Sequence, residues 1–208
     1  MKPIEIWNFD KEYLDIFKTV EFTLVDHARC YFLFKMAKHF SRVHGEAAEV
    51  GVYKGGTARV LTSIFSKSQK EIYLFDTFEG MPEVDKGKDM HSKGDFADCS
   101  LESVEKLLSD LSHYKIYKGF FPESAKDIND KKFCFVHVDV DIYKSVKDCC
   151  EFFYNKMIAG GIMIFDDYGW PSCPGAKDAV DEFFSGKKEE VIYLPSGQAF
   201  IIKLNQDY

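Results

Sequence analysis

The chain has 208 residues, of which 46% are hydrophobic and 29% are charged. This suffices for one well-cored domain and excludes disorder as the default state. The 27 lysines and arginines against 34 aspartates and glutamates give a net charge of −7, spread along the chain. Because nucleic-acid binding needs a basic face, this balance disfavours DNA or long RNA as a partner.

No signal core or membrane span is visible in the sequence. The opening residues carry charges at Lys2, Glu5 and Asp10, and no uncharged apolar run approaches the roughly 18 residues that a bilayer requires. We therefore expect no membrane partner and a cytoplasmic location. The six cysteines include no C-x-x-C pair, and a chain of this length does not need disulfides, so we expect reduced thiols.

Short apolar runs alternate with amphipathic stretches, which is typical of an α/β fold with a mainly parallel sheet. Helical spacing predicts helices over about 26–44, 55–65, 101–111, 146–157 and 176–184. The apolar runs predict strands over 47–52, 71–75, 115–118, 133–138, 162–165, 191–194 and 199–203. The polar stretch 83–99 is too long for a tight connection, and we interpret it as a mobile lid.

The end of the chain fixes a feature of the topology. Only residues 195–198 separate the last two predicted strands, and this is too short for a parallel crossover, so these strands must pair antiparallel. The predicted fold class is therefore α/β, with a Rossmann-like, seven-stranded, mostly parallel sheet, a reversed C-terminal β-hairpin and helices on both faces. Class I methyltransferases have a sheet of this kind.

A glycine-containing loop follows the first strand, running from Glu49 through Gly51 to Thr57. A phosphate-binding P-loop is excluded, because Thr57 stands where that motif needs lysine. A dinucleotide-binding loop is excluded as well, because Tyr53 occupies the second glycine position and would block the pyrophosphate. The loop still allows close contact with a smaller ligand.

Two carboxylates flank this loop and indicate the charge of the ligand. Glu49 lies just before the loop, and Asp76 ends the next strand, 25 residues after Gly51. An acidic residue near this offset accepts hydrogen bonds from ribose hydroxyls. The pair would repel a pyrophosphate but suits a cationic ligand with a ribose diol, and S-adenosylmethionine is such a ligand. Alternatively, Asp76 caps the following turn and Glu49 forms a salt bridge.

Further aspartates follow the fourth and fifth strands. If these strands are neighbours, Asp139, Asp166 and Asp167 converge at the carboxyl edge of the sheet, where open α/β folds bind ligands. Three carboxylates repel one another unless a cation lies among them, and all-oxygen ligation favours Mg²⁺. The ion would bind a substrate hydroxyl and lower its pKa. Alternatively, Asp166 and Asp167 form a turn. We interpret Asp141 as a helix cap and His137 as a hydrogen-bonded core residue.

Several motifs occur in the order found in a known family. They span residues 49–56 (EVGVYKGG), 75–82 (FDTFEGMP), 118–122, 138–145 (VDVDIYKS), 165–169 (FDDYG) and 179–183. Together they resemble the macrocin O-methyltransferase (TylF-type) family from about residue 42 to residue 184. This resemblance implies an S-adenosylmethionine-dependent and Mg²⁺-dependent class I O-methyltransferase, in a family whose studied members methylate sugar hydroxyls of antibiotics.

The resemblance also implies roles for individual residues. Glu49, Gly51 and Thr57 would lie along the methionine part of the cofactor, Asp76 would hold its ribose, and Thr77, Phe78, Gly119 and Phe120 would border its adenine. Asp139, Asp166 and Asp167 would hold the metal, and Asp139 would also help to remove the hydroxyl proton. Residues 45–208 would form the methyltransferase domain. The helical segment 1–44 would build the acceptor pocket or subunit contacts of a homo-oligomer.

The chain departs from the family pattern in two places. His137 stands where the family usually has an arginine, and the final strand over 197–202 lacks the family's tryptophan. The acceptor therefore stays open among small molecules that carry a sugar hydroxyl, a phenol or a catechol.

Two other functions are compatible with parts of the sequence. The run Asp139-Val-Asp141 resembles the nucleophile motif of haloacid-dehalogenase-type phosphatases, although Tyr143 stands where that motif has Thr or Val. A domain that binds the cofactor without catalysis is the second alternative. It predicts a broken metal site, and the three aspartates argue against that.

Overall fold

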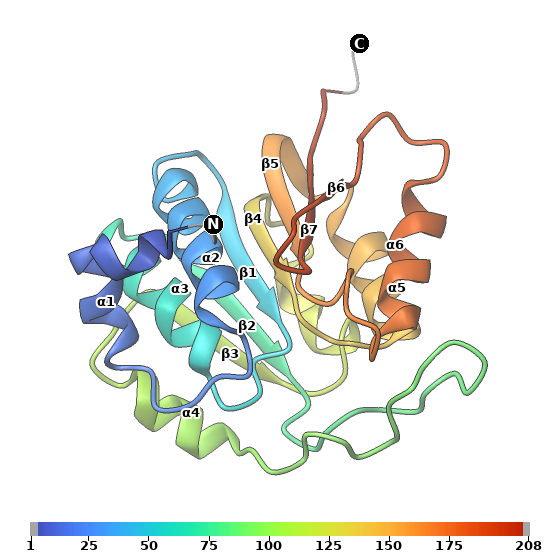
Figure 1. Ribbon diagram of the computed structural model, residues 1–208, viewed down its shortest axis with the longest axis horizontal. Helices are drawn as coiled ribbons and strands as arrows, with labels where there is room; N and C mark the ends of the chain where they lie inside the picture. Colours follow the sequence, from blue (N-terminus) through green and yellow to red (C-terminus); the bar gives the residue numbers. More distant parts are fainter. Residues whose placement is uncertain (1–3, 206–208) are drawn as a thin grey trace.

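A computed structural model describes residues 4–205 (Figure 1). Seven strands form one sheet in the order β3-β2-β1-β4-β5-β7-β6. The strands are β1 (Glu46–Val50), β2 (Ile72–Asp76), β3 (Tyr114–Lys118), β4 (Phe133–Val138), β5 (Met157–Phe165), β6 (Ile192–Tyr193) and β7 (Ala199–Ile202). The first five are parallel, and β7 pairs antiparallel with both β5 and β6. The predicted fold class, including the reversed hairpin, is confirmed.

Helices cover both faces of the sheet (Figure 1). They are η1 (Ile6–Phe9), α1 (Lys11–Phe17), α2 (His27–Phe40), α3 (Gly56–Lys67), α4 (Leu101–Leu108), η2 (Glu123–Ile128), α5 (Tyr143–Phe153) and α6 (Pro174–Phe184). Helices α1 to α4 pack on one face, and η2, α5 and α6 pack on the other. Side chains alternate along β2 accordingly, since Leu74 faces the first group of helices and Phe75 the second.

The N-terminal helices are part of the same hydrophobic core as the sheet. Leu33 and Phe34 of α2 are fully buried in one cluster with Ile72 and Leu74 of β2. Of the predicted N-terminal segment, residues 1–3 lie outside the described residues. Its role in an acceptor pocket or a subunit contact stays a prediction. Among residues 4–205, no helix is long and apolar enough to cross a membrane.

Some element boundaries differ from the predicted ones. Helix α2 ends at Phe40 rather than near residue 44. Met157 does not end the helix that precedes it, because it pairs with Phe133 and begins β5. Its apolar side chain fits the helical period, but that pattern cannot distinguish the last turn of a helix from the first residue of a buried strand. All six cysteines have free thiols.

Candidate active site

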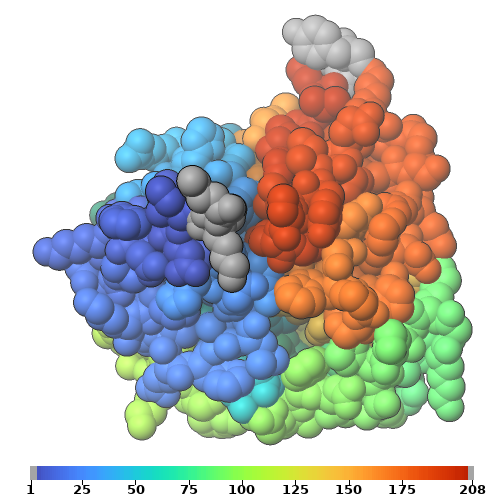
Figure 2. Space-filling view, viewed as in Figure 1, coloured from blue at the N-terminus to red at the C-terminus, as the bar shows by residue number. Residues whose placement is uncertain are grey.

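A cavity of about 670 Å³ opens at the carboxyl edge of the sheet, beside the ends of β1, β2, β4 and β5. The order of the strands changes direction between β1 and β4, and open α/β sheets bind their ligands at such a point. Residues 22–25, which precede α2, contribute to the wall. On the surface, the N-terminal part of the chain (blue) lies beside the C-terminal hairpin (red) (Figure 2). The N-terminal segment therefore contributes to the cavity wall as well as to the surface beside the hairpin.

Most of the predicted cofactor residues line this cavity: Gly51, Thr57, Asp76, Thr77, Gly119 and Phe120. Two lie elsewhere. Phe78 is buried in the hydrophobic core on the α1–α4 face. Glu49 is fully buried and its side chain contacts His137 instead of the cavity. The salt-bridge alternative for Glu49 therefore describes its position better than a cofactor contact does.

Asp76 is held by the backbone around it. Its Oδ2 accepts bonds from the N–H groups of Val52 (2.8 Å) and Tyr53 (2.7 Å), and its Oδ1 accepts from Phe78 N–H (2.7 Å). A carboxylate offers about four acceptor positions, so one position on Oδ1 stays free for a ligand hydroxyl. The turn contact with Phe78 and a ligand contact are thus compatible.

Gly51 is required by packing within the protein. Its φ is +92°, a region that favours glycine, and a Cβ atom there would lie 1.7 Å from the Asp139 carbonyl oxygen. The glycine therefore lets the ends of β1 and β4 approach each other, which brings Asp139 to the cavity wall.

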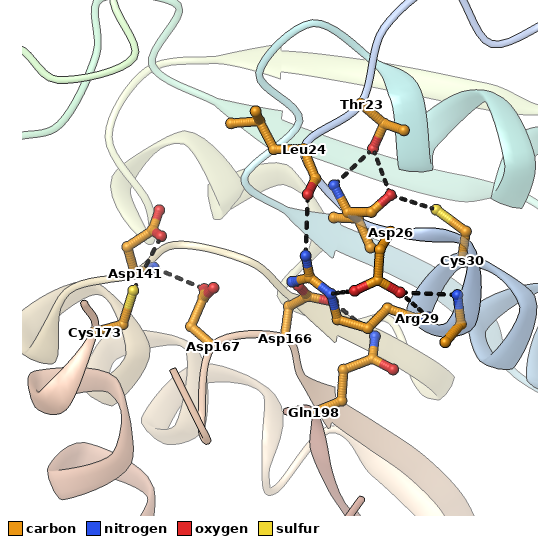
Figure 3. Close-up of polar contacts among 12 residues, drawn as sticks. Thr23, Leu24, Asp26, Arg29, Cys30, Asp141, Asp166, Asp167, Cys173 and Gln198 are labelled. Carbon is orange, nitrogen blue, oxygen red and sulfur yellow. Dashed lines mark hydrogen bonds and ion pairs between the residues drawn. The ribbon is translucent and has the colours of Figure 1, made fainter. Parts of the chain in front are cut away.

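A buried chain of charged groups runs behind the cavity. His137 Nδ1 lies 2.9 Å from Glu49 Oε1, and His137 Nε2 lies 3.4 Å from Asp166 Oδ1. Asp166 also forms a buried ion pair with Arg29 and accepts a 2.6 Å bond from Gln198 Nε2 (Figure 3). The prediction that His137 is a hydrogen-bonded core residue is confirmed. No sequence pattern indicated Arg29 or Gln198 as members of the site.

This chain of contacts sets the ionisation of its members. Burial alone would lower the pKa of His137, but its bonds to Asp166 and Glu49 raise the pKa to about 10, so the ring is cationic at neutral pH. Burial would raise the pKa of Asp166, yet His137 and Arg29 hold it below its usual value. Asp166 is therefore an ionised carboxylate between two cations.

Arg29 connects the N-terminal segment to the end of β5. Besides Asp166, its guanidinium contacts Asp26 (3.1 Å) and the Leu24 carbonyl oxygen (3.0 Å) (Figure 3). It also lies 4.7 Å from the centre of the Trp170 ring. Its partner Asp166 is 137 residues away in the chain, so no local signal could have revealed the pair.

The predicted acidic group is divided in two. Asp139 and Asp166 carry oxygens within 4.8 Å of each other and of a His137 ring nitrogen. Asp167 points to the other side, toward Asp141, whose N–H donates to Asp167 Oδ2 at 3.2 Å (Figure 3). Consecutive residues after a strand leave on opposite sides, which separates Asp166 from Asp167. All three still line the cavity.

Asp141 does not cap α5, so that prediction is wrong. The N-cap residue is Ile142, and it makes no side-chain cap bond. Asp141 has a φ of +58°, which turns its side chain toward the cavity instead of toward the helix. The positive φ was invisible in the sequence, where an aspartate after a strand is typical of a cap.

A hard divalent cation fits the charge and donor type of this region. Burial, and then the nearby Asp166, raise the pKa of Asp139 well above its usual value; burial and Asp141 do the same for Asp167. Both carboxyl groups thus lie in a negative field without a dedicated positive partner, unlike Asp166 with Arg29. A cation at this part of the cavity wall would supply that charge, and oxygen donors suit Mg²⁺.

The fold is that of the Rossmann-like methyltransferases. The structure of the O-methyltransferase NovP is similar, with a TM-score of 0.76 and 22% identity over 88% of this chain and 82% of that one. Calicheamicin methyltransferase CalS11 gives a TM-score of 0.70 and 16% identity, over 97% and 98% of the two chains. The model of the macrocin-O-methyltransferase (TylF) family matches residues 15–192, and the chain belongs to this family.

Relatives with known names are O-methyltransferases of natural products. Demethyldecarbamoylnovobiocin O-methyltransferase of Streptomyces niveus is 26% identical over 69% of this chain and 59% of its own length. Mycinamicin III 3''-O-methyltransferase of Micromonospora griseorubida is 25% identical over 73% of this chain and 66% of its own. The chain thus spans about three fifths to two thirds of the length of these relatives.

Proposed function

We propose that the protein is an S-adenosylmethionine-dependent O-methyltransferase that methylates a hydroxyl group of a small molecule with the help of Mg²⁺. The observation that carries this proposal is the acidic cavity at the β1/β4 switch point, with Asp76 at one end and Asp139 and Asp167 at the other. A related structure of an O-methyltransferase from Bacillus cereus, with a TM-score of 0.60 and 14% identity over 93% of this chain and 90% of that one, is a complex with S-adenosylhomocysteine.

The cofactor supplies an electrophilic methyl group on a positively charged sulfur. Six of the cavity residues would hold it: Gly51 and Thr57 along the methionine part, Asp76 at the ribose, and Thr77, Gly119 and Phe120 at the adenine. Asp76 has one free acceptor position for a ribose hydroxyl, and its negative charge complements a cationic ligand. Glu49 acts indirectly, since its carboxylate fixes His137 behind the site.

Mg²⁺ would be held by Asp139 and Asp167, with Asp166 beside them, and would lower the pKa of the substrate hydroxyl. Asp139 would also accept the hydroxyl proton as the general base. Arg29 and His137 keep Asp166 ionised and fixed. Positioning of the two reactants at one edge of the sheet would then account for much of the rate.

The acceptor is proposed from the relatives, whose names indicate natural products as substrates. We expect a sugar hydroxyl first and a phenol or catechol second. Phosphoryl transfer, the alternative suggested by the D-x-D run, finds no support in the fold, because the sheet and its reversed hairpin are those of methyltransferases. The cytoplasmic location and the homo-oligomer stay predictions.

The proposed function is tested by transfer of an isotope-labelled methyl group from S-adenosylmethionine to a panel of glycosides and catechols. We expect transfer that needs Mg²⁺ and stops in EDTA. Asp139→Asn should reduce the rate at least about 100-fold, the usual contribution of a general base, while it still binds S-adenosylhomocysteine.

The matched control is Asp130→Asn, which changes an exposed aspartate in a turn and should leave the rate unchanged. Undiminished turnover in EDTA would refute the role of the metal. Equal rates for the two aspartate variants would refute the role of Asp139.

A further inference from the structure

Three side chains that have no part in the proposed mechanism meet at the cavity wall. His91 comes from the long connection between β2 and α4, Asp141 follows β4, and Cys173 precedes α6. Cys173 Sγ lies 3.4 Å from Asp141 Oδ1 and 3.6 Å from His91 Nε2, and His91 Nε2 lies 3.8 Å from Asp141 Oδ1. The three donor atoms therefore form a nearly equilateral triangle.

The size of this triangle matches one face of a tetrahedral metal centre. Zinc binds sulfur at about 2.3 Å and nitrogen or oxygen at about 2.0–2.1 Å, so tetrahedral angles place neighbouring donor atoms roughly 3.3–3.6 Å apart. The observed separations of 3.4, 3.6 and 3.8 Å need adjustments of a few tenths of an ångström at most. Thiolate and imidazole donors select zinc-like ions over Mg²⁺, which prefers oxygen.

The histidine is oriented by a second carboxylate. His91 Nδ1 lies 3.3 Å from Asp95 Oδ2, which also accepts a 2.9 Å bond from the Ser92 N–H. A carboxylate on the far ring nitrogen is the usual partner of a metal-binding histidine, because it fixes the tautomer and leaves the other nitrogen free to bind. Here Nε2 is the free nitrogen, and it faces Asp141 and Cys173.

Access and charge also suit an ion. The His91 and Asp141 side chains are 18% and 21% exposed, whereas Cys173 is only 3% exposed, so the triangle is open on one side and closed on the other. Asp167 Oδ2 accepts a 3.2 Å bond from the Asp141 N–H and so holds the backbone of one ligand in place. A thiolate and a carboxylate would together neutralise a divalent cation.

We propose that His91, Asp141 and Cys173 bind a zinc-class divalent transition metal ion, with the fourth coordination position open toward the cavity. Binding releases the thiol proton of Cys173 to solvent, so that the thiolate becomes the ligand. The test of this site does not depend on the proposed methyl transfer, because it measures metal binding alone.

The ion would fasten the connection that carries His91 to the ends of α5 and α6. Two other contacts already hold this connection there. Asp89 Oδ1 accepts a 2.8 Å bond from the Tyr143 N–H at the start of α5, and Lys88 forms a 2.8 Å ion pair with Glu182 of α6. A metal at the triangle would be a third and stronger fastening, directly at the cavity. It would hold residues 83–99, predicted as a lid, against the part of the cavity wall formed by the segments that precede α5 and α6.

The test is equilibrium dialysis of the whole chain against Zn²⁺ in excess Mg²⁺, combined with Co²⁺ spectroscopy. Excess Mg²⁺ occupies sites built from carboxylates alone. We expect one equivalent of Zn²⁺, and a thiolate-to-Co²⁺ charge-transfer band in the near ultraviolet. Cys173→Ser and His91→Ala should abolish the band and weaken Zn²⁺ binding at least about 100-fold, because each removes a direct ligand.

Matched controls are Cys99→Ser and His113→Ala, which change a cysteine and a histidine outside the triangle and should bind like the wild type. Asp95→Asn keeps all three ligands but removes the partner of His91, so it should weaken Zn²⁺ binding about 10- to 100-fold. This variant still tests the site if a variant of a direct ligand fails to fold. A wild type without stoichiometric Zn²⁺, or a Co²⁺ band that survives in Cys173→Ser, would overturn the site. Titration of the same proteins with S-adenosylhomocysteine separates that failure from a failure of the proposed function.

Discussion

At the scale of single residues, Gly51 links the backbone to the site. Its positive φ and its contact with the Asp139 carbonyl oxygen are two separate reasons for glycine at this position. Gly160 in β5 shares the first reason, with a φ of +80°, but no atom lies within 4 Å of the position of its missing Cβ. Comparison of the two positions therefore separates the cost of a positive φ, which both share, from the cost of a steric clash, which only Gly51 has.

We predict that Gly51→Ala destabilises the protein more than Gly160→Ala does. The Gly160 variant should lose about 1–2 kcal/mol, the cost of a left-handed conformation for a residue with a Cβ atom. The Gly51 variant should lose clearly more, because its Cβ would meet the Asp139 backbone. Urea unfolding of both variants measures the difference in the free energy of unfolding. Equal losses would show that the β1–β4 contact does not constrain Gly51.

Sequence reasoning located the aspartates of the site but not all of their directions. Asp139, Asp166 and Asp167 follow buried strands, and strand ends of a parallel sheet meet at one edge, so their presence at the cavity was predictable. The directions of Asp141 and Glu49 were not. A positive φ turns the first away from its helix, and a histidine on a neighbouring strand binds the second.

At the scale of elements, the C-terminal hairpin was predictable because loop length excludes a parallel crossover. The segment 1–44 was predicted as helical, but the separate helix before residue 26 was not delimited, because α1 is only seven residues long and is held by its packing on α2 and α3 rather than by a strong local pattern. Near the hairpin, Lys203 Nζ lies 2.6 Å from Glu189 Oε1, and both side chains are almost completely buried.

We predict that this pair makes stability depend on pH. Burial would raise the pKa of Glu189, but bonds from Lys203 and Tyr154 hold it below its ordinary value of 4.5. Because the folded-state pKa is lowered, the ionised Glu189 stabilises the fold above about pH 4.5, and this contribution is lost as the pH falls through the lower folded-state value.

Glu189→Gln should therefore cost about 3–5 kcal/mol at pH 7, since it leaves Lys203 buried without a counter-charge. The difference from the wild type should shrink as the pH drops below about 4.5. Chemical unfolding at a series of pH values measures it, with the exposed Glu83→Gln, whose partner is Lys93, as the control. A difference that stays constant down to the acid limit would contradict the ionised pair.

At the scale of the whole molecule, the N-terminal helix α2 packs against the C-terminal strand β7 and contacts the end of β5. Phe32 of α2 lies 5.7 Å from Phe200 of β7, between ring centres, and Arg29 pairs with Asp166. The N-terminal segment is thus part of the site as well as of the core. The sequence indicated this segment as helical, but not that it supplies a cation, since the contact exists only after the sheet has formed.

We predict that Arg29→Met lowers the free energy of unfolding by about 3–5 kcal/mol, because it removes one of the two cations that contact the buried Asp166 carboxylate. Lys18→Met is the matched control, since the Lys18–Asp15 pair is exposed and should be worth less than about 1 kcal/mol. Unfolding in guanidinium chloride measures both variants. Similar losses of unfolding free energy in the two variants would mean that the Arg29–Asp166 ion pair does not stabilise the packing of the N-terminal segment.

The most direct test of the proposed function is calorimetric titration of the whole chain with S-adenosylhomocysteine. We predict one site per chain in the wild type and an affinity roughly 10- to 100-fold lower in Asp76→Asn and Asp76→Ala, the loss expected for a charged hydrogen bond. Asp130→Asn should bind like the wild type. A wild type that releases no heat of binding, or Asp76 variants that bind as tightly as the wild type, would contradict a cofactor site at this cavity.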